Sequence, residues 1–309
     1  MSTNNTNSRM RNNSLISLLM TTRPSFLTLT PACIFLGVSI VIYLKLPINY
    51  FLLFIIVIGA ISAHVSVNML NEYIDFKSGL DLQTIKTAFS GGSGALPANP
   101  NAANLTIIMG LITLTLTALI GIYLLLTKGS LILPIGIAGI VLIITYTPWL
   151  NKHPLLCLLA PGLGFGVLMV VGTYVVLADQ YAQLAWLLSI PPFLLINNLL
   201  LLNQYPDIDA DANIGRRTLP IVYGITMSNL IYGLFALSSY ALIVYYVVKD
   251  YIPSLSLIAL LPMLFSIYTG YGALKHGSQV GLFPRYMAAN VAVCLLMPCL
   301  LGIGLILGQ

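Results

Sequence analysis

The sequence predicts an all-α polytopic membrane protein. Of its 309 residues, 58% are hydrophobic and only 7% are charged, with a mean hydropathy of +0.96, whereas soluble domains carry about 25% charged residues. The apolar residues fall into runs of about 20, the length that crosses a bilayer as a helix. Because lipid offers the backbone no hydrogen-bond partners, helices are the expected form. We therefore predict about nine transmembrane helices bundled around a central cavity.

Nine apolar runs are the candidate spans, at residues 25–44, 50–70, 104–126, 131–149, 155–178, 184–203, 219–248, 253–273 and 288–308. The seventh is long, and we expect a separate first turn near Gly224. Residues 1–22 are polar and are expected to form a disordered tail. Residues 23–309 then form a single transmembrane domain, whose first run lacks a small-residue cleavage site and is expected to be a span.

Basic residues are divided unevenly between the two sets of connections that alternate along these spans. The set that includes the N-terminus holds ten, and the other set holds three, Lys45, Lys128 and Lys249. The positive-inside rule therefore predicts that the N-terminus and the first set lie in the cytoplasm. We expect an integral protein of a bacterial or archaeal cell (inner) membrane. The formal charge of +5 reflects this topology and does not indicate nucleic-acid binding.

Six of the eight acidic residues lie in two cytoplasmic connections, after the second and sixth spans. This spacing suggests two pseudo-repeated four-helix halves plus a last helix, with one acidic site per half. In "NMLNEYIDFKSGLD", residues 68–81, Asn71 and Asp75 are four apart and share a helix face. Gly79 permits a turn that brings Asp81 alongside them.

The second acidic connection reads "NQYPDIDADANIGRRT", residues 203–218. Asn203, Asp207 and Asp211 recur at four-residue steps, again on one helix face. Pro206 is expected to kink this helix locally, because it removes a backbone donor.

Carboxylates gathered at a membrane boundary lose hydration, repel one another and need a cation. Mg²⁺ prefers oxygen ligands and commonly joins one or two carboxylates to substrate phosphates. We therefore expect two Mg²⁺ ions with a diphosphate between them. The expected metal ligands are Asn71, Asp75, Asp81, Asn203, Asp207 and Asp211, of which Asp75, Asp207 and Asp211 are the expected catalytic residues. The expected diphosphate contacts are Asn71, Lys77, Lys86, Asn203, Arg216 and Arg217.

A diphosphate deep in a hydrophobic bundle suits a substrate with a long isoprenoid tail. Mg²⁺ and basic side chains stabilise a departing diphosphate, which allows the allylic C–O bond to ionise, and aromatic faces shield the cation. A membrane prenyltransferase that ionises a polyprenyl diphosphate is therefore predicted. An ion-coupled transporter is the alternative from another class, but transporter acids tend to lie near the bilayer midplane.

The pairing of "NEYIDFKSGLD" with "NQYPDIDADANIGRRTLP" across nine spans resembles the UbiA superfamily of intramembrane prenyltransferases. The resemblance covers essentially the whole chain from Arg23, and implies a helical bundle, two Mg²⁺ ions bound through the diphosphate and a lateral opening for the lipid tail. It matches Lys86 to a basic position that contacts diphosphate, and it matches Asn71, Asp75, Asp81, Asp207 and Asp211 to metal–diphosphate positions. Asn203 matches the Asn that precedes the second acidic element of the family.

The spacing of Asp75, Gly79 and Asp81, with the later "FSGGSGALP", resembles the branch that uses 1,4-dihydroxy-2-naphthoate to make menaquinone. Quinone biosynthesis is therefore the expected role, with 4-hydroxybenzoate, homogentisate and glycerophosphate as alternative acceptors. The chain departs from the superfamily pattern at Glu72, where Asp commonly follows the Asn, and at Gly79, where the last acid of the motif commonly stands. A Tyr-x-x-x-Lys element is also replaced by "YTPWLNK", which places Lys152 six residues after Tyr146.

The acceptor pocket is expected to involve His64, Tyr146, Asn197 and Asn198. A histidine satisfied in the interior and asparagines that only join neighbouring helices are the alternatives. The Gly/Ser-rich loop at residues 89–100 has three possible roles: an anion cradle, a mobile lid or a plain connection.

Overall fold

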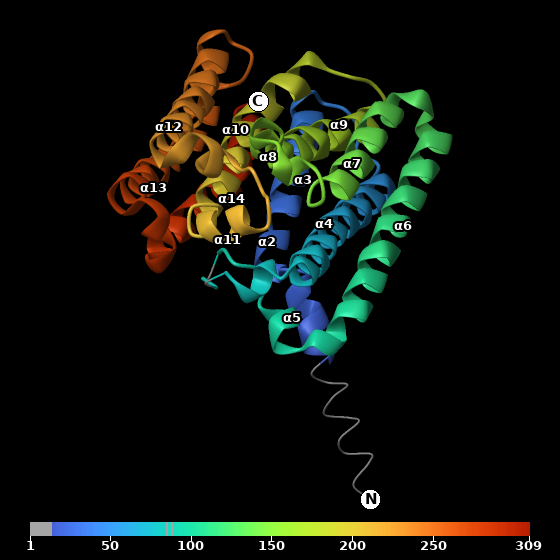
Figure 1. The fold of residues 1–309 in the computed structure, drawn as a ribbon. Coiled ribbons are helices and arrows are strands. Elements are labelled where there is room, and N and C mark those ends of the chain that lie inside the picture. The colour runs from blue at the N-terminus through green and yellow to red at the C-terminus, as the bar shows by residue number, and fades with distance from the viewer. Residues whose placement is uncertain (1–13, 85, 88) are drawn as a thin grey trace, which may run out of the picture.

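The computed structural model describes residues 14–84, 86–87 and 89–309. Within these residues every regular element is helical (Figure 1). The all-α membrane class is confirmed by eight helical segments that are long and apolar enough to cross a bilayer: Ser14–Tyr43, Tyr50–Ser78, Pro100–Thr145, Pro154–Ala178, Gln183–Asn203, Leu219–Val248, Ser254–Leu282 and Pro284–Leu307. The third of these contains two of the nine predicted spans, so the count of nine stays a prediction.

The N-terminal part of the chain is helical earlier than the sequence analysis expected. Residues 1–13 of the predicted tail lie outside the described residues, but residues 14–21 form a helix because apolar side chains begin at Leu15. Arg23 then adopts a left-handed conformation with φ 52°, and it precedes Pro24, which disfavours an α conformation at the residue before it. Two helices follow, α2 (Pro24–Leu27) and α3 (Leu29–Tyr43).

Three helices form one side of the bundle. Helix α4 (Tyr50–Ser78) begins at Asn49, whose Oδ1 accepts a bond of 3.1 Å from the Leu52 amide and so caps the helix. Helix α6 (Ala103–Lys128) packs along α4, and α7 (Leu133–Thr145) follows after a turn at Gly129 and the 3₁₀ segment η3 (Gly129–Ile132) (Figure 1).

The fifth predicted span is one continuous helical segment that changes its winding. It consists of α8 (Pro154–Pro161), the π-helical η5 (Gly162–Met169) and α9 (Val170–Ala178). Helix α10 (Gln183–Asn203) packs directly on η5. A Cβ at Gly166 would lie 2.4 Å from the Phe193 backbone, so only glycine permits this close approach of two membrane helices.

The C-terminal part of the bundle follows a short helix, α11 (Ile208–Asn213). Gly224 interrupts α12 (Leu219–Val248) with φ 77° and ψ 168°, which confirms the separate first turn expected there. The remaining elements are η6 (Ser254–Leu260), α13 (Met263–His276), η7 (Gly277–Leu282) and α14 (Pro284–Leu307).

The core lies where α3, α9, α10 and α14 pack together, around Leu36, Tyr174, Leu188 and Met297, which are fully buried. On the outside of the bundle, large apolar side chains such as Leu126 remain exposed, as expected for a surface that faces lipid. The short connections at the site are η1 (Leu80–Leu82), α5 (Ala95–Ala98), η2 (Pro100–Ala102) and η4 (Leu150–Lys152).

Candidate functional site

The first acidic group lies at the C-terminal end of α4. Asn71 and Asp75 share one face of this helix, and Asn71 Nδ2 donates a bond of 3.0 Å to Asp75 Oδ2. Gly79 ends the helix in a left-handed conformation with φ 78°, and the chain turns into η1. The turn places Asp81 in the wall of the same cavity as Asp75, as the sequence analysis expected.

The second acidic group does not lie on one continuous helix. Helix α10 ends at Asn203, residues 204–207 form a turn that contains Pro206, and α11 begins after Asp207. The predicted helical face with a local kink is therefore wrong, because the proline ends the helix. A bond of 2.8 Å from the Asp211 amide to the Asp207 carbonyl nevertheless restores a helical turn between these two acids.

One arginine joins the two acidic groups. Arg216 Nη1 donates a bond of 2.9 Å to Asp211 Oδ1, and its Nη2 contacts Asp75 Oδ1. All three side chains are buried or nearly so, with 14% of Arg216, 7% of Asp75 and 5% of Asp211 exposed. Such burial of charge is costly unless the charges are paired. The ion pair therefore ties together two motifs that are far apart in the sequence.

Burial and crowding shift the ionisation of the acids outside the spans. Burial, with the charges of Glu72 and Asp75, raises the pKa of Asp81 to about 7. Burial, with the charge of Asp211, raises the pKa of Asp207 to about 7, although the Gly91 amide offsets part of the shift. A cation bound beside these two carboxylates would favour their ionised forms and lower both pKa values.

A cavity of about 420 Å³ connects the acidic groups to an apolar lane between the helices. Its polar mouth is lined by Asn71, Asp75, Asp81, Asn203, Asp207, Asp211 and Arg216. The lane is lined by apolar residues and glycines of α4, α6, α7, η5 and α9, among them Ile120, Ile135, Gly136, Gly139, Gly164 and Met169. A ligand that fits both parts has an anionic head and a hydrocarbon tail.

The mouth carries oxygen donors that suit Mg²⁺. Asp81 Oδ2, Asn203 Oδ1 and Asp207 Oδ1 are buried, and none has a hydrogen-bond partner among the described residues. Carboxylate and amide oxygens are the ligand types that Mg²⁺ prefers, so these residues fit the ion. No three His, Cys, Asp or Glu side chains in the described ranges lie close enough to hold an ion by themselves. Substrate oxygens are therefore expected to complete the coordination.

Two of the four residues predicted for the acceptor pocket line the cavity, His64 and Tyr146. His64 Nδ1 lies 2.9 Å from Thr30 Oγ1, and its ring meets the Phe165 ring edge-on at 4.5 Å between centroids. Tyr146 directly follows α7 and caps its C-terminal end.

Asn197 and Asn198, which were also predicted for the acceptor pocket, are not among the residues that line the cavity. Asn197 Oδ1 accepts a bond of 2.7 Å from the Gly162 amide in η5. Asn198 Nδ2 donates a bond of 2.8 Å to the Tyr232 carbonyl in α12. Both asparagines join neighbouring helices, which was the alternative reading.

Three of the four predicted basic diphosphate contacts are outside the cavity wall, and only Arg216 lines it. Lys77 is exposed and lies over the Tyr73 ring, 5.7 Å from its centroid. Lys86 is exposed and donates to the Ser93 carbonyl. Arg217 is also exposed. Proximity in sequence did not show which way these side chains point.

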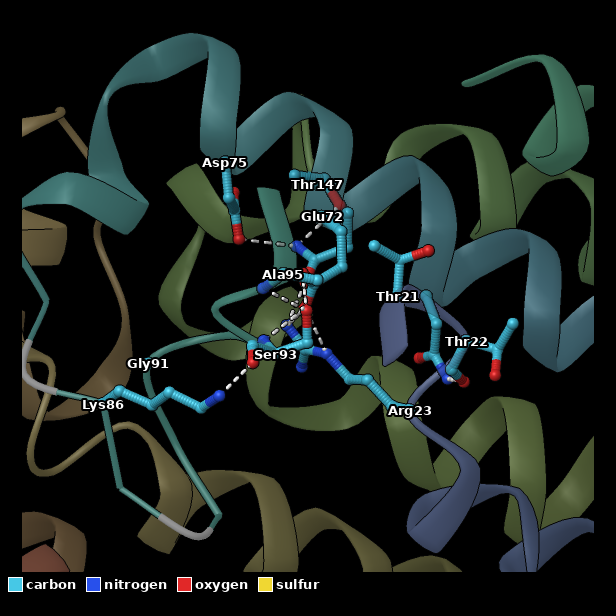
Figure 2. Close-up of polar contacts among 12 residues, drawn as sticks. Thr21, Thr22, Arg23, Glu72, Asp75, Lys86, Gly91, Ser93, Ala95 and Thr147 are labelled. Atoms are coloured by element: carbon cyan, nitrogen blue, oxygen red, sulfur yellow. Dashed lines mark hydrogen bonds and ion pairs between the residues drawn. The ribbon is translucent and has the colours of Figure 1, made fainter. Parts of the chain in front are cut away.

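A basic residue that the sequence analysis did not assign to the site, Arg23, does line the cavity. Its Nε donates a bond of 2.7 Å to Glu72 Oε1, and its Nη2 donates one of 3.2 Å to Asn71 Oδ1 (Figure 2). One feature of the sequence could have indicated this role. Apolar residues begin at Leu15, and the charged Arg23, with Pro24, interrupts them. Arg23 lies within the candidate membrane span Ser14–Tyr43, and a charged residue within such a span is expected to have a polar partner.

The Gly/Ser-rich loop forms part of the cavity wall. Phe89, Ser90, Gly91 and Gly92 line the cavity. The Gly91 amide donates a bond of 3.1 Å to Asp207 Oδ2. Gly91 and Gly92 have φ values of 75° and 70°, a conformation that glycine adopts readily. The loop thus lines the cavity and contacts the second acidic group directly.

Fold and site together define a polytopic helical membrane protein with an acid-lined cavity that opens into an apolar lane. The chain matches the UbiA prenyltransferase family over residues 29–292. It therefore belongs to the UbiA prenyltransferase family.

Proteins of known sequence are among those similar to the chain. It is 29% identical over 207 residues to the 1,4-dihydroxy-2-naphthoate octaprenyltransferase of Bacillus subtilis (strain 168), across 66% of this chain and 64% of that protein, just under two thirds of the relative's length. It is 28% identical over 232 residues to UbiA prenyltransferase domain-containing protein 1 of Dictyostelium discoideum, across 71% of this chain and 67% of that protein.

The solved structures share the fold at low sequence identity. A UbiA homologue from Archaeoglobus fulgidus bound to DMAPP and Mg²⁺ has a TM-score of 0.62 and 11% identity, covering 95% of this chain and 100% of that one. A UbiA homologue from Aeropyrum pernix K1 has a TM-score of 0.63 and 17% identity, covering 91% and 97%.

Proposed function

We propose that the protein transfers a polyprenyl group from an allylic polyprenyl diphosphate to a small aromatic acceptor. The observation that carries the proposal is the single cavity that joins an acidic, Arg216-bearing mouth to an apolar lane within the membrane spans. A prenyl diphosphate has the matching halves, an anionic head and a hydrocarbon tail. Membership of the UbiA prenyltransferase family supports the same reaction class.

The head of the substrate is proposed to bind at the mouth. Asp75, Asp81, Asp207 and Asp211, with the amide oxygens of Asn71 and Asn203, would hold two Mg²⁺ ions together with the diphosphate of the substrate. When bound, Mg²⁺ neutralises the negative charge that develops on the departing diphosphate. Arg216 adds a fixed cationic group that can form bidentate bonds to phosphate oxygens.

The chain's own residues would then orient the tail and protect the allylic carbon. The lane keeps the tail in an apolar environment, and the loop residues 89–92 form part of the cavity wall. The Phe165 ring, held against His64, presents an aromatic group in the cavity wall where it can stabilise positive charge on carbon. Attack by the electron-rich acceptor ring and loss of a proton or carboxylate would complete the transfer.

The proposed acceptor is 1,4-dihydroxy-2-naphthoate, which makes the protein a menaquinone-biosynthesis enzyme. The naphthoate octaprenyltransferase of Bacillus subtilis, at 29% identity, supports this choice. His64 and Tyr146 are proposed to contact the acceptor, since both line the cavity. 4-Hydroxybenzoate, homogentisate and glycerophosphate are the alternative acceptors. From the distribution of Lys and Arg we propose that the N-terminus and the mouth face the cytoplasm of a bacterial or archaeal cell.

The test uses the full chain in lipid nanodiscs with Mg²⁺, a polyprenyl diphosphate and each of the four acceptors in turn. Mass spectrometry should detect a Mg²⁺-dependent prenylated product, formed fastest with 1,4-dihydroxy-2-naphthoate. If product forms faster with another acceptor, that acceptor is the substrate in place of 1,4-dihydroxy-2-naphthoate. Absence of product with all four, combined with cation-coupled uptake in proteoliposomes, would support the transporter alternative.

A further inference from the structure

Glu72 is an acidic residue of the first motif that the proposed chemistry does not use. It follows Asn71 on α4, its side chain is fully buried, and it is not among the residues that line the cavity. A buried carboxylate is stable only where it is paired and hydrogen-bonded. Its partners therefore indicate what it does.

Glu72 binds two segments that come from different parts of the chain. Arg23 donates to Oε1 at 2.7 Å from the start of the first span, and the Ser93 amide donates to the same oxygen at 2.8 Å from the Gly/Ser-rich loop. The Ser93 hydroxyl donates to Oε2 at 2.6 Å. Figure 2 shows Arg23 and Ser93 converging on Glu72. Both carboxylate oxygens are thus engaged in holding other segments.

Further contacts of Ser93 and its neighbours fix the rest of the loop. Its Oγ also accepts a bond of 3.1 Å from the Ala95 amide, which fixes the start of α5. Two residues earlier, the Gly91 amide is bonded to Asp207. Between them, a Cβ at Gly92 would lie 2.9 Å from Asp81 Oδ1, so the backbone passes directly against that acid. The loop is therefore fixed at Glu72 and reaches both acidic groups of the mouth.

We infer that Glu72 is a positioning residue and not a metal ligand. With Arg23, it holds Ser93 and thereby keeps the preceding loop residues 89–92 in place as the part of the cavity wall that keeps water from the allylic carbon. This inference rests on the proposed prenyl transfer. Glu72 stands where the superfamily pattern commonly has Asp, and its carboxylate contacts partners on two segments at once. The inference also assigns one role to the Gly/Ser-rich loop, for which the sequence alone left three possible roles open.

Opening the wall has a defined chemical consequence. The C–O bond of the prenyl diphosphate breaks and its electron pair leaves with the diphosphate. Water then adds to the allylic carbon in place of the acceptor ring and loses one proton to solvent. The products are a prenol and diphosphate, so the ratio of prenol to prenylated acceptor measures how well water is excluded.

The experiment compares Glu72→Ala, Glu72→Gln and Ser93→Ala in the full chain in nanodiscs, with Mg²⁺, geranylgeranyl diphosphate and 1,4-dihydroxy-2-naphthoate. Glu72→Ala should raise the ratio of prenol to prenylated acceptor about tenfold or more, since one lost charge-assisted hydrogen bond amounts to about that factor. Glu72→Gln retains an acceptor oxygen and should raise it less. Ser93→Ala, which removes only a hydroxyl, tests the loop contact even where Glu72→Ala folds poorly. Asp209→Asn, at an exposed acid, is the matched control and should keep the wild-type ratio.

Two further readouts separate the possible failures. Hydrogen–deuterium exchange of the peptide containing Gly91 and Ser93 should accelerate in Glu72→Ala, because both amides are hydrogen-bonded in this structure. The half-saturating Mg²⁺ concentration of Glu72→Gln should stay within about twofold of wild type, whereas a metal ligand would shift it by about 10-fold or more. Wild-type exchange and product ratios in both Glu72→Ala and Ser93→Ala would overturn the inference. A different result would reject the prenyl transfer and not the role of Glu72. In that case the wild-type protein forms no prenylated product, but hydrogen–deuterium exchange of the loop still accelerates in Glu72→Ala.

Discussion

Arg216 offers a direct test of how the two acidic groups are held together. Arg216→Met keeps most of the apolar length of the side chain but removes the charge that pairs with Asp75 and Asp211. Breaking a buried ion pair by removing one partner costs about 3–5 kcal/mol, because the remaining charges stay buried and unpaired. Because 14% of the Arg216 side chain is exposed, solvent partly screens its charge. We therefore expect the free energy of unfolding to fall by about 3 kcal/mol at pH 7.5, which lowers the Tm by on the order of 5–10 °C.

The loss of stability should depend on pH with a definite sign. Burial already raises the pKa of Asp211, with Arg216 offsetting part of that shift. Without Arg216 the pKa of Asp211 in the folded state rises further above its value in the unfolded state. The loss of folding stability is therefore present while Asp211 is ionised, and it disappears as the pH falls through the folded-state pKa. The deficit relative to wild type should therefore be smaller at pH 5 than at pH 7.5.

The assay is thermal unfolding in nanodiscs at both pH values, followed by circular dichroism. Arg217→Met is the matched control, since Arg217 is exposed and has no ion pair within the described ranges. It should unfold within about 1 °C of wild type, as is usual for surface substitutions. A deficit for Arg216→Met that is absent at pH 7.5, or equal at both pH values, would refute the reasoning.

Two further predictions concern metal and tail binding. Because the pKa values of Asp81 and Asp207 are about 7, roughly a tenth of each is ionised at pH 6 and nine tenths at pH 8. The half-saturating Mg²⁺ concentration should therefore fall about tenfold or more from pH 6 to pH 8, and a constant value would contradict the assignment of these ligands. A Cβ at Gly139 meets no atom within 4 Å and would project from the cavity wall, so Gly139→Leu should shift the preference towards shorter prenyl diphosphates. Gly121→Leu, at a glycine equally free of contacts but outside the cavity wall, is the control, and an equal shift in both variants would reject this path for the tail.

Local sequence rules were sufficient for the first acidic group. The four-residue spacing of Asn71 and Asp75 and the turn at Gly79 are set by helix geometry and by the freedom of glycine at positive φ. The same spacing failed for Asp207, because Pro206 ends the helix where only a kink was expected. The tendency of a proline to end a helix depends on packing that spacing alone does not describe.

Other features depend on contacts between distant parts of the chain. Arg23 and Glu72 are 49 residues apart, and no periodic pattern relates them. Lys77 and Arg217 lie close to the acids in sequence but are directed away from the cavity, since neighbouring positions on a helix or turn face different sides. The duplication of two four-helix halves stays a prediction.

The central claim is that acids from both motifs act on one diphosphate. A double-mutant cycle with Asp75→Asn and Asp207→Asn, measured as Mg²⁺-dependent binding of an unreactive prenyl thiodiphosphate, tests it most directly. We expect each single variant to weaken binding about tenfold or more, and the double variant to weaken it by clearly less than the product, with a coupling of about 1 kcal/mol or greater. Independent effects that multiply fully, or binding that does not depend on Mg²⁺, would contradict the account.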